Sequence, residues 1–334
     1  MSEFRQNFIT KEWVIIAPER KKRPHDFKKE EAQTKIPEYD KNCPFCPGNY
    51  SEKYEETLFE IKEGNRWLLR VVKNRYSALH PDTEPMRQRE KSHLKVMGYG
   101  FAEVIIESPY HNKNFSNYTL SEIKNILLAY KNRYDTLSHY HPKIDLILIF
   151  KNYGRYAGTS LIHPHSQIIA TPIVPLSLRT ALLEARVFCD EQGICPFCQM
   201  IKEEKEQNVR VPYENENFIA ICPFASRTPY EVWILPKRHS AKFDFNDEEL
   251  TDFADILSKI LKALHKIFPD LSYNYIIKSA PIEDHNVEYF HWYLEILPRL
   301  TMPAGFEMGS GIYINPTPPE EASKEIKERI INYD

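Results

Sequence analysis

The sequence is poor in glycine, in long apolar runs and in excess charge of either sign. Its 334 residues include ten glycines, and none belongs to a Walker phosphate loop or a GxGxxG dinucleotide fingerprint. The longest apolar runs, such as Ile144–Phe150, are far too short to cross a bilayer. A formal net charge of −3 does not fit a protein that coats nucleic acid. The segment Met1–Thr10 contains no signal-peptide stretch, so we expect a cytoplasmic protein without membrane or nucleic-acid partners.

The length and composition are those of a globular protein. A chain of 334 residues fits two domains of ordinary size or one duplicated unit. Hydrophobic residues make up 42% and charged residues 27%, which supports a buried core and excludes a disordered tail or a coiled coil.

Four of the six cysteines fall in two copies of one motif, Cys43-Pro-Phe-Cys46 and Cys195-Pro-Phe-Cys198. In a cytoplasmic chain, paired CxxC motifs indicate metal sites more often than disulfides. A thioredoxin-like redox motif stays open as an alternative, although it does not explain two copies. Cys189 and Cys222 lack such partners, and we interpret them as ordinary buried thiols.

Histidines complete both motifs when the second half of the sequence is placed on the first with an offset of 128. His111 then falls on His239 and His163 on His291, and the two histidines lie 52 residues apart in both copies. A tetrahedral zinc site needs four such ligands, and a site without an open position is structural. Ordinary surface or core histidines are the alternative. The sequence predicts two structural zinc sites: Cys43, Cys46, His111 and His163, and Cys195, Cys198, His239 and His291.

The same offset predicts a repeated order of strands and helices. The expected elements, first copy before second, are a strand (Glu103–Glu107 and Glu231–Leu235), an amphipathic helix (Leu120–Tyr130 and Leu250–Leu264), a strand (Asp145–Phe150 and Tyr273–Ile277) and a last strand (His163–Ile169 and His291–Leu297). The chain is therefore predicted to be a tandem repeat of units that mix helices and strands.

Chemistry is expected where the two copies differ. The first copy reads His163-Pro-His165-Ser-Gln167, and the second has Tyr293 and Glu295 in place of His165 and Gln167. Residues two apart on a strand point the same way, so we expect His163, His165 and Gln167 on one face. A free neutral imidazole beside a hydrogen-bond donor is a plausible nucleophile toward phosphorus. A turn with two ordinary histidines is the alternative interpretation.

A polar loop precedes this segment. It runs from Asn152 through Gly158 to Ser160, between two predicted strands. Such a loop can direct asparagine, serine and backbone N–H groups at phosphate oxygens.

The segment Asn152–Gln167, with the pattern Asn-x5-Gly-x-Ser-x2-His-Pro-His-x-Gln, resembles the active-site signature of galactose-1-phosphate uridylyltransferases. These enzymes form the transferase branch of the histidine-triad superfamily. Further motifs of that family are similar to the segments Trp13–Pro24, Cys43–Cys46, Val72–Leu79, Glu107–His111 and Ala304–Glu307 with the following Pro316–Ala322. The resemblance covers nearly the whole chain.

This resemblance implies a fold and an assembly. It implies an α+β fold in which two histidine-triad-like domains, residues 1–175 and 176–334, follow each other, with mostly antiparallel sheets and packed helices. The first domain would carry the HPHSQ segment and one zinc site, and the second would carry the other zinc site and the sugar-binding segment. The resemblance also implies a homodimer.

The implied chemistry is ping-pong nucleotidyl transfer from a nucleoside diphosphate sugar. His165 would attack the α-phosphorus, the carbonyl of His163 would fix the tautomer of His165, and Gln167 and Ser160 would stabilise the phosphate oxygens. The resemblance implies a set of substrate-binding residues as well: Arg20, Arg23, Asn74, Asn152, Gly158 and Glu307. Without the resemblance, we would interpret the two arginines as part of a solvent-exposed run of basic residues and Glu307 as an acidic residue on the surface.

Two departures bear on the substrate. Some family members carry a lysine six residues before the sugar-binding glutamate and a glutamine six residues after it, where this chain has Thr301 and Tyr313. The loss of both donors weakens the case for galactose. The segments Leu297–Thr301 and Gly305–Asn315 also look closer to a branch that contains ADP-glucose phosphorylases.

Four functions stay open at this point. The first is a UDP-hexose:hexose-1-phosphate uridylyltransferase, and the second is an ADP-glucose (nucleoside diphosphate sugar) phosphorylase that uses phosphate as acceptor. The third is a histidine-triad hydrolase with water as acceptor. The fourth, from another class, is a zinc-stabilised nucleotide- or RNA-binding module without catalysis, which the intact HPHxQ segment argues against.

Overall fold

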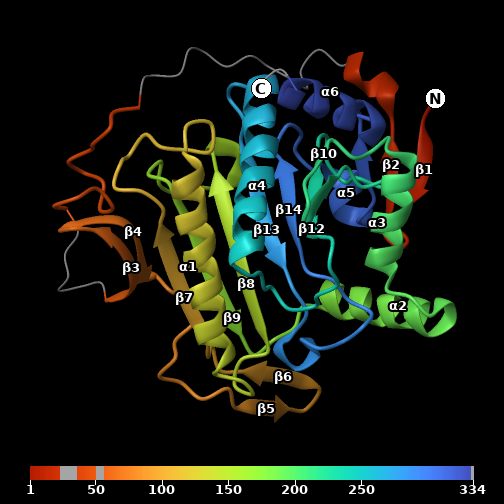
Figure 1. The fold of residues 1–334 in the computed structure, drawn as a ribbon. Helices are drawn as coiled ribbons and strands as arrows, with labels where there is room; N and C mark the ends of the chain where they lie inside the picture. Colours follow the sequence, from red (N-terminus) through yellow and green to blue (C-terminus); the bar gives the residue numbers. More distant parts are fainter. Residues whose placement is uncertain (23–35, 50–55, 332–334) are drawn as a thin grey trace.

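A computed structural model describes residues 1–22, 36–49 and 56–331. Within these residues the centre of the protein is a ten-stranded sheet in which all neighbouring strands are antiparallel (Figure 1). In order across the sheet, the strands are β10 (Tyr213–Glu214), β11 (Phe218–Ile221), β12 (Val232–Pro236), β14 (Tyr293–Pro298), β13 (Tyr273–Lys278), β8 (Leu146–Tyr153), β9 (His165–Thr171), β7 (Phe101–Ile106), β4 (Arg66–Lys73) and β3 (Thr57–Glu63).

The sheet has an internal two-fold arrangement about the central pair β8 and β13. Outward from β8 lie β9, β7, β4 and β3, and outward from β13 lie β14, β12, β11 and β10. We call the first set, with helix α1 (Leu120–Ser138), the first half, and the second set, with helix α4 (Asp247–Ile267), the second half. The predicted α+β fold, with a duplicated unit and mostly antiparallel sheet, is confirmed.

Helices α1 and α4 lie side by side across one face of the sheet, which we call the helix face (Figure 1). Both begin with a capping box, in which Thr119 and Asn246 accept from the backbone N–H three residues on. Their apolar stripes, including Leu127 and Leu257, are completely buried in the main core. The opposite face, which we call the site face, therefore carries the alternate strand residues.

The site face of the second half is covered by α2 (Leu176–Gln192) and α3 (Pro196–Gln207), whose apolar residues form a second core with β11, β12 and β14. Helix α6 (Pro319–Ile331) packs on α4. The remaining elements are β1 (Glu3–Gln6), β2 (Trp13–Ile16), η1 (Pro18–Lys22), β5 (Arg87–Glu90), β6 (His93–Val96), η2 (Arg155–Ala157), η3 (Ile282–Asp284), α5 (Gly305–Ser310) and β15 (Tyr313–Asn315).

The division of the chain at residue 175 stays a prediction. That residue lies between β9 and α2, which is a connection between elements. The main sheet continues across the division through the pairing of β8 with β13. The N-terminal strand β2 pairs in parallel with β15, and Arg5 of β1 donates to the carbonyl of Phe224 (3.1 Å), so the start of the chain lies against the second half.

The predicted starts of the last strand in each copy are wrong. Strand β9 begins at His165 and β14 at Tyr293, two residues later than expected. His163 and His291 precede these strands because each directs Nδ1 into a cysteine–histidine cluster, while Nε2 contacts a backbone carbonyl at 2.8 Å. Since His163 lies outside the strand, the alternation argument places only His165 and Gln167 on one face.

The offset of 128 is also wrong at two pairs of strands. Phe150 of β8 pairs with Gln167 and Ile276 of β13 pairs with Glu295, so the offset between these strands is 126. Between β7 and β12 the offset is wrong by one residue. Val104 of β7 pairs with Gln167, and Trp233 of β12 pairs with Glu295, the counterpart of Gln167. Val104 therefore corresponds to Trp233 and not to Val232. The physical reason is one extra residue in the first half between this strand and the metal-ligand histidine.

None of the described helices is long and apolar enough to cross a membrane.

Candidate active site and metal clusters

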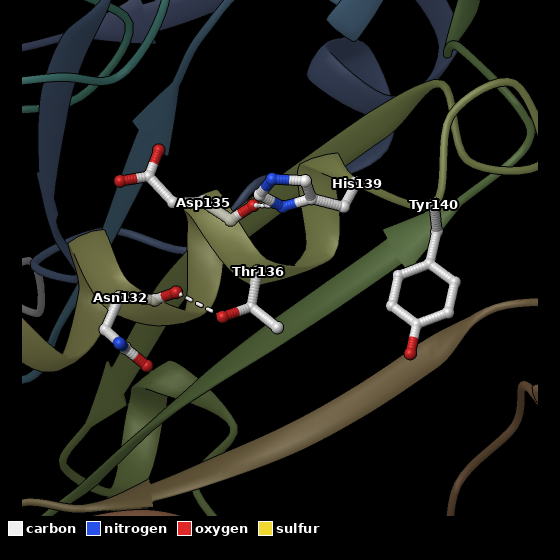
Figure 2. Close-up of a pocket in the computed structure, with 5 residues that line it drawn as sticks. All are labelled: Asn132, Asp135, Thr136, His139 and Tyr140. Carbon is white, nitrogen blue, oxygen red and sulfur yellow. Dashed lines mark hydrogen bonds between the residues drawn. The ribbon is translucent and has the colours of Figure 1, made fainter.

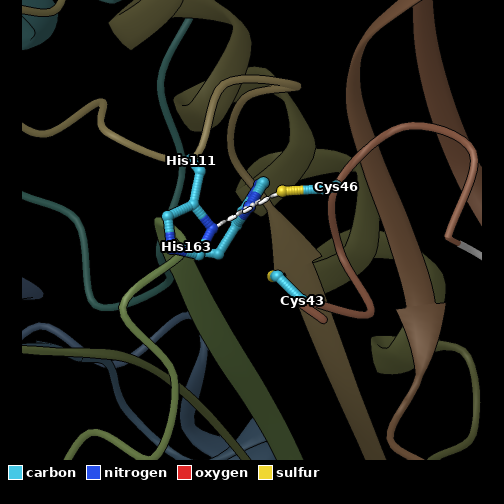
Figure 3. A group of neighbouring side chains, drawn as sticks. All are labelled: Cys43, Cys46, His111 and His163. Atoms are coloured by element: carbon cyan, nitrogen blue, oxygen red, sulfur yellow. Dashed lines mark hydrogen bonds between the residues drawn. The ribbon is translucent and has the colours of Figure 1, made fainter. Parts of the chain in front are cut away.

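Three loops, the last of which leads into β9, bring four potential metal ligands together in the first half (Figure 3). The ligand atoms of Cys43, Cys46, His111 and His163 lie within 4.8 Å of one another, and all four residues are buried. The Nδ1 atoms of the two histidines are 3.3 Å apart, and the Sγ of Cys46 is 3.5 and 3.6 Å from them. Burial lowers the pKa of His163 to about 4, which keeps its ring neutral and able to ligate a metal ion.

The second half repeats this arrangement with Cys195, Cys198, His239 and His291. The Sγ of Cys198 lies 3.4 Å from Nδ1 of His239 and 3.8 Å from Nδ1 of His291. His291 contacts the carbonyl of Pro236 through Nε2 at 2.8 Å, which leaves Nδ1 for a metal ion. His239 is exposed and Cys198 half-buried, so this cluster is more open to solvent than the first. Both predicted ligand sets thus come together, and both could hold a metal ion.

His165 opens β9 directly beside the first cluster. Its Nδ1 lies 2.8 Å from the carbonyl of His163, the contact that the family resemblance implied. Donation from Nδ1 fixes the tautomer and leaves the lone pair on Nε2. Among the described residues, Nε2 has no hydrogen-bond partner. Burial lowers the pKa of His165, so the ring is neutral and nucleophilic at neutral pH.

The ring of Phe45, inside the first CxxC motif, packs against both histidines. Its centroid lies 5.9 Å from that of His163 and 5.7 Å from that of His165, with edge-on geometry. The metal cluster, the aromatic ring and the free imidazole therefore form one packed unit.

Gln167 and Asn152 lie on the site face with His165. Gln167 is two residues along β9, and the neighbouring strand β8 carries Asn152 two residues beyond Phe150, the partner of Gln167. Asn274 of β13 donates to the Oδ1 of Asn152 (2.8 Å) and to the carbonyl of Ala157 (3.0 Å). These contacts orient the Asn152 amide and leave its N–H donors for a ligand.

The loop after β8 is bent tightly onto the second half. At Gly154, with φ +84°, an added Cβ would lie 2.3 Å from Oγ of Ser272, so only glycine fits there. Gly158, with φ +78°, is also in the left-handed region. Ser160 is exposed just before the HPH segment. Of these loop residues, Asn152 lies on the site face, and no hydrogen bond joins Ser160 to His165 among the described residues.

The other predicted substrate-binding residues make no hydrogen bond to the imidazole among the described residues. Arg20 is in η1, Asn74 directly follows β4, and Glu307 is in α5, where its carboxylate accepts from the N–H of Ala304 (3.1 Å). No hydrogen bond or ion pair joins any of them to His165 in the described part of the chain. Arg23 lies outside the described residues.

The positions equivalent to the site carry different chemistry in the second half. Tyr293 replaces His165, and its ring stacks on Trp233 with centroids 4.5 Å apart. Glu295 replaces Gln167 and is 1% exposed, with ion pairs to Arg227 (2.6 Å) and Lys278 (2.8 Å). The second half therefore presents neither a free imidazole nor a free amide at these positions.

Sequence reasoning missed several residues around His165. Phe45 could have been found, because the repeated CPFC motif marks it in both copies. Asn274 and Lys151 are polar residues within strongly apolar strands, which is a weak signal for a buried contact. Glu107 ends a predicted strand and opens the family-like segment Glu107–His111, but neither feature predicts its buried ion pair with Lys151.

A depression on the outer surface of α1 is unrelated to this site (Figure 2). It is lined by Asn132, Asp135, Thr136, His139 and Tyr140. Two of these side chains hydrogen-bond to carbonyls of the helix itself, Thr136 to Asn132 and His139 to Asp135 (both 2.8 Å). The depression lies on the helix side of the sheet, whereas His165 is on the site face.

Comparison with known proteins gives a consistent result. The family model for the galactose-1-phosphate uridyl transferase N-terminal domain matches residues 1–175, and a domain of unknown function (DUF4921) matches residues 112–333. An ADP-glucose phosphorylase of Arabidopsis thaliana is 36% identical over 98% of this chain and 92% of its own length. A galactose-1-phosphate uridylyltransferase of Thermotoga maritima is 33% identical over 98% of both chains.

A solved structure agrees over the full length. The crystal structure of an ADP-glucose phosphorylase from Arabidopsis thaliana with bound ADP-glucose superposes with a TM-score of 0.84 and 35% identity, over 98% of this chain and 99% of that chain. The fold, the CPFC and HPHSQ segments and these similarities agree. The chain belongs to the galactose-1-phosphate uridylyltransferase family of nucleotidyl-transferring enzymes.

Proposed function

We propose that the protein transfers the nucleotidyl group of a nucleoside diphosphate sugar through a covalent intermediate on His165. The observation that carries this proposal is the neutral imidazole whose Nδ1 contacts the His163 carbonyl at 2.8 Å and whose Nε2 is left without a partner among the described residues. A histidine held in this tautomer is ready to attack phosphorus without first losing a proton.

The reaction has two displacements. In the first, the Nε2 lone pair of His165 forms a bond to the α-phosphorus, the bond from that phosphorus to the bridging oxygen breaks, and a sugar 1-phosphate leaves. In the second, an oxygen of the acceptor phosphate attacks the same phosphorus, and the N–P bond breaks to return the neutral imidazole. Gln167 and Ser160 donate to the non-bridging oxygens, and Asn152 and backbone N–H groups near Gly158 bind the phosphates.

We assign the remaining contacts to the ends of the substrate. Asn74 lies near the nucleoside, Arg20 and Arg23 meet the entering or leaving phosphate, and Glu307 holds sugar hydroxyls. The family resemblance supports these roles. A twofold or smaller change in the half-saturating substrate concentration on substitution of Asn74 by alanine would remove that residue from the list.

The first candidate reaction is UDP-glucose:galactose-1-phosphate uridylyl transfer. The match of residues 1–175 to the uridyl transferase model and the relative from Thermotoga maritima support it. The second candidate is the phosphorolysis of ADP-glucose, with phosphate as acceptor. It is favoured by Thr301 and Tyr313, which replace two sugar-site donors, and by the Arabidopsis thaliana relative.

We further propose that each cluster binds one structural zinc ion. Tetrahedral zinc, with bonds of about 2.0–2.1 Å to nitrogen and about 2.3 Å to sulfur, separates two nitrogens by about 3.3 Å and a nitrogen from a sulfur by about 3.6 Å. In the first cluster these separations are 3.3, 3.5 and 3.6 Å. When bound, zinc would join the chain segments of each half, and with four protein ligands it leaves no position for substrate. Elemental analysis should find two zinc ions per chain; a value of zero would remove this assignment.

The covalent step is tested by intact mass spectrometry. The protein is incubated with UDP-glucose or ADP-glucose and quenched, and we expect a mass gain of one nucleotide that is absent in His165→Ala. No gain with either compound would falsify the transferase and phosphorylase proposals together, and would leave the hydrolase and the non-catalytic binding module.

The acceptor is then identified from the labelled protein. Galactose 1-phosphate is expected to discharge the label of a uridylyltransferase, and inorganic phosphate that of a phosphorylase. Loss of the label in buffer alone at a comparable rate would identify a hydrolase.

We also propose that the protein works as a homodimer in the cytoplasm. The family resemblance supports the dimer, and the composition supports the compartment. A mass of 39.4 kDa by light scattering would correspond to the single chain and contradict the dimer.

A further inference from the structure

A buried ion pair lies beneath the strand that carries His165. The Nζ of Lys151 is 2.6 Å from the Oε2 of Glu107, and the two side chains are 1% and 0% exposed. The hydroxyl of Tyr118 donates to the same carboxylate oxygen (3.1 Å). Lys151 lies on the helix face of β8, opposite to the site face, and so contacts no substrate.

Both members of the pair bind the backbone around His165. The Nζ of Lys151 donates to the carbonyl of His165 (3.0 Å), and the N–H of Glu107 donates to the carbonyl of Pro164 (3.1 Å). The carbonyl of His163 contacts the imidazole itself. Three consecutive carbonyls thus fix the main chain and the ring of the proposed nucleophile.

The Lys151 ammonium supplies a contact that the sheet does not. The ladder between β8 and β9 ends at the pair of Phe150 and Gln167, two residues before His165 is reached. Without a donor from β8, the carbonyl of His165 would be an unpaired buried acceptor at the end of the strand.

The second half has the same fold without this pair. On β8, Phe150 pairs with Gln167, and the next residue is Lys151. On β13, Ile276 pairs with Glu295, and the next residue is Ile277. Ile277 is 1% exposed and lies in the apolar core. A lysine is therefore not required at this position for the sheet to form.

Glu107 has no counterpart in the second half. The carbonyls of Ser108 and Pro236 occupy equivalent places, because each accepts from Nε2 of a metal-facing histidine at 2.8 Å. Three residues separate Val104 from Ser108, but two separate Trp233 from Pro236. The extra residue in the first half is Glu107, which directly follows β7.

An ion pair at this depth is an unfavourable way to fill a core. The transfer of two charges from water to the protein interior costs free energy, and their mutual attraction offsets only part of that cost. Replacement of such a pair by apolar residues often leaves the stability of a protein unchanged or raises it. Burial lowers the pKa of Lys151, and the Glu107 carboxylate opposes that shift. The pair is present in the half that carries the imidazole and absent from the half that carries tyrosine.

We propose that Lys151 and Glu107 are positioning residues that hold the His165 backbone, and through it the imidazole, in line with the α-phosphorus. This inference rests on the proposed function of His165. The pair acts through His165 and touches no substrate atom, so its loss should slow the chemical step and leave substrate binding unchanged.

The test uses the double variant Glu107→Gln/Lys151→Met, which leaves no unpaired buried charge. The rate of nucleotidyl labelling is measured by quenched-flow mass spectrometry over a range of UDP-glucose and ADP-glucose concentrations. We expect the saturating rate to fall about 10- to 100-fold while the half-saturating concentration stays within about twofold of the wild type. The single variant Lys151→Arg retains a cationic donor and should recover most of the rate.

A matched control lies on the same face of the sheet, four residues before Glu107. Glu103 of β7 and Arg133 of α1 form a second buried ion pair, with hydrogen bonds of 2.7 and 2.6 Å, and neither residue contacts the HPH segment. The double variant Glu103→Gln/Arg133→Met should lower the melting temperature but leave the saturating rate within about twofold of the wild type.

The outcomes separate the two proposals. If the wild type takes no label, the proposed function fails. If the wild type is labelled and the Glu107→Gln/Lys151→Met variant is labelled equally fast, the positioning role is overturned and the proposed function stands. A double variant that does not fold, or a control variant that loses as much rate, overturns the positioning role as well, because the pair would then be structural.

Discussion

The two halves of the sheet share a framework and differ in chemistry. Each has a CPFC motif and two histidines that converge on one cluster, and each has a long helix on the helix face. On the site face the first half has His165 and Gln167, and the second half has Tyr293 and Glu295 at the same positions. The metal clusters therefore belong to the common framework, and the chemistry belongs to the residues that differ.

The difference also shows why the second half has no ligand-binding group at the positions that correspond to the site. In the second half, Glu295 is held by Arg227 and Lys278, and Tyr293 is packed among residues of α2 and α3. Charges that pair with each other and rings that pack in a core leave no group free to bind a ligand. In the first half, Gln167 has no hydrogen-bond partner among the described residues, so its amide is available to a substrate.

The largest expected effect comes from breaking the two metal clusters separately. Cys43→Ser and Cys195→Ser should each lower the free energy of unfolding by about 5 kcal/mol, because metal binding contributes to folding. Only Cys43→Ser should also reduce labelling of the remaining folded protein, since His163 both faces the cluster and contacts His165 through its carbonyl. Thermal melting, zinc content and labelling rate check this. Equal losses of activity in the two variants would show that the second cluster is not purely structural.

The next effect comes from exchanging the residues that distinguish the halves. Gln167→Glu places a negative charge beside the phosphate and should slow labelling about 100-fold. Glu295→Gln removes a charge that faces Arg227 and Lys278, so it should lower the melting temperature and leave the labelling rate within about twofold. A Gln167→Glu protein with the wild-type rate would place the phosphate elsewhere.

A smaller effect is expected at the phenylalanines of the CPFC motifs. Phe45 contacts both histidines of the HPH segment, and Phe197 contacts His291 and Tyr293. Phe45→Leu and Phe197→Leu should each cost about 1 kcal/mol of stability. Only Phe45→Leu should also slow labelling, about tenfold, because the imidazole loses a packing partner. A similar slowing in both variants would mean that the ring acts on the fold and not on His165.

The smallest expected effect is on the pH dependence of stability, and it comes from a residue beside the pairing of β8 with β13. His265 of α4 packs against Tyr153 of β8 and Tyr273 of β13, and burial lowers its pKa from 6.5 to about 4. The unfolded chain therefore takes up a proton first as the pH falls, so this residue reduces stability progressively below pH 6.5 and fully below pH 4. Between pH 7.5 and pH 6 the loss amounts to about 1 kcal/mol.

The variant His265→Phe should remove this contribution. Its free energy of unfolding, measured by urea denaturation at both pH values, should change by about 1 kcal/mol less than that of the wild type. Gln is a less suitable replacement, because Nε2 of His265 is buried without a hydrogen-bond partner among the described residues. An unchanged pH dependence would mean that His265 is protonated in the folded protein.

The sequence predicted the framework well because it is encoded locally and twice. The CxxC spacing and the 52-residue interval identified all the cluster residues, and apolar periodicity identified α1 and α4. The prediction failed at His163, which leaves the strand to reach the metal cluster. It failed again at β7, where one extra residue, Glu107, shifts the register.

The buried contacts behind His165 could not be predicted for a physical reason. Lys151 follows an apolar run, and a charged residue at the end of a predicted strand normally points to solvent. Its actual partners, Glu107 and the carbonyl of His165, are 44 and 14 residues away, so only the folded sheet brings them together. Local propensity carries no information on such contacts.

The most direct test of the account locates the covalent label within the chain. The protein is incubated with UDP-glucose or ADP-glucose, digested under mild conditions, and its peptides are sequenced by tandem mass spectrometry. We predict one nucleotide per chain, attached to His165, and an unmodified peptide around Tyr293. A nucleotide on any residue of the second half, or on a different residue of the first, would contradict the account.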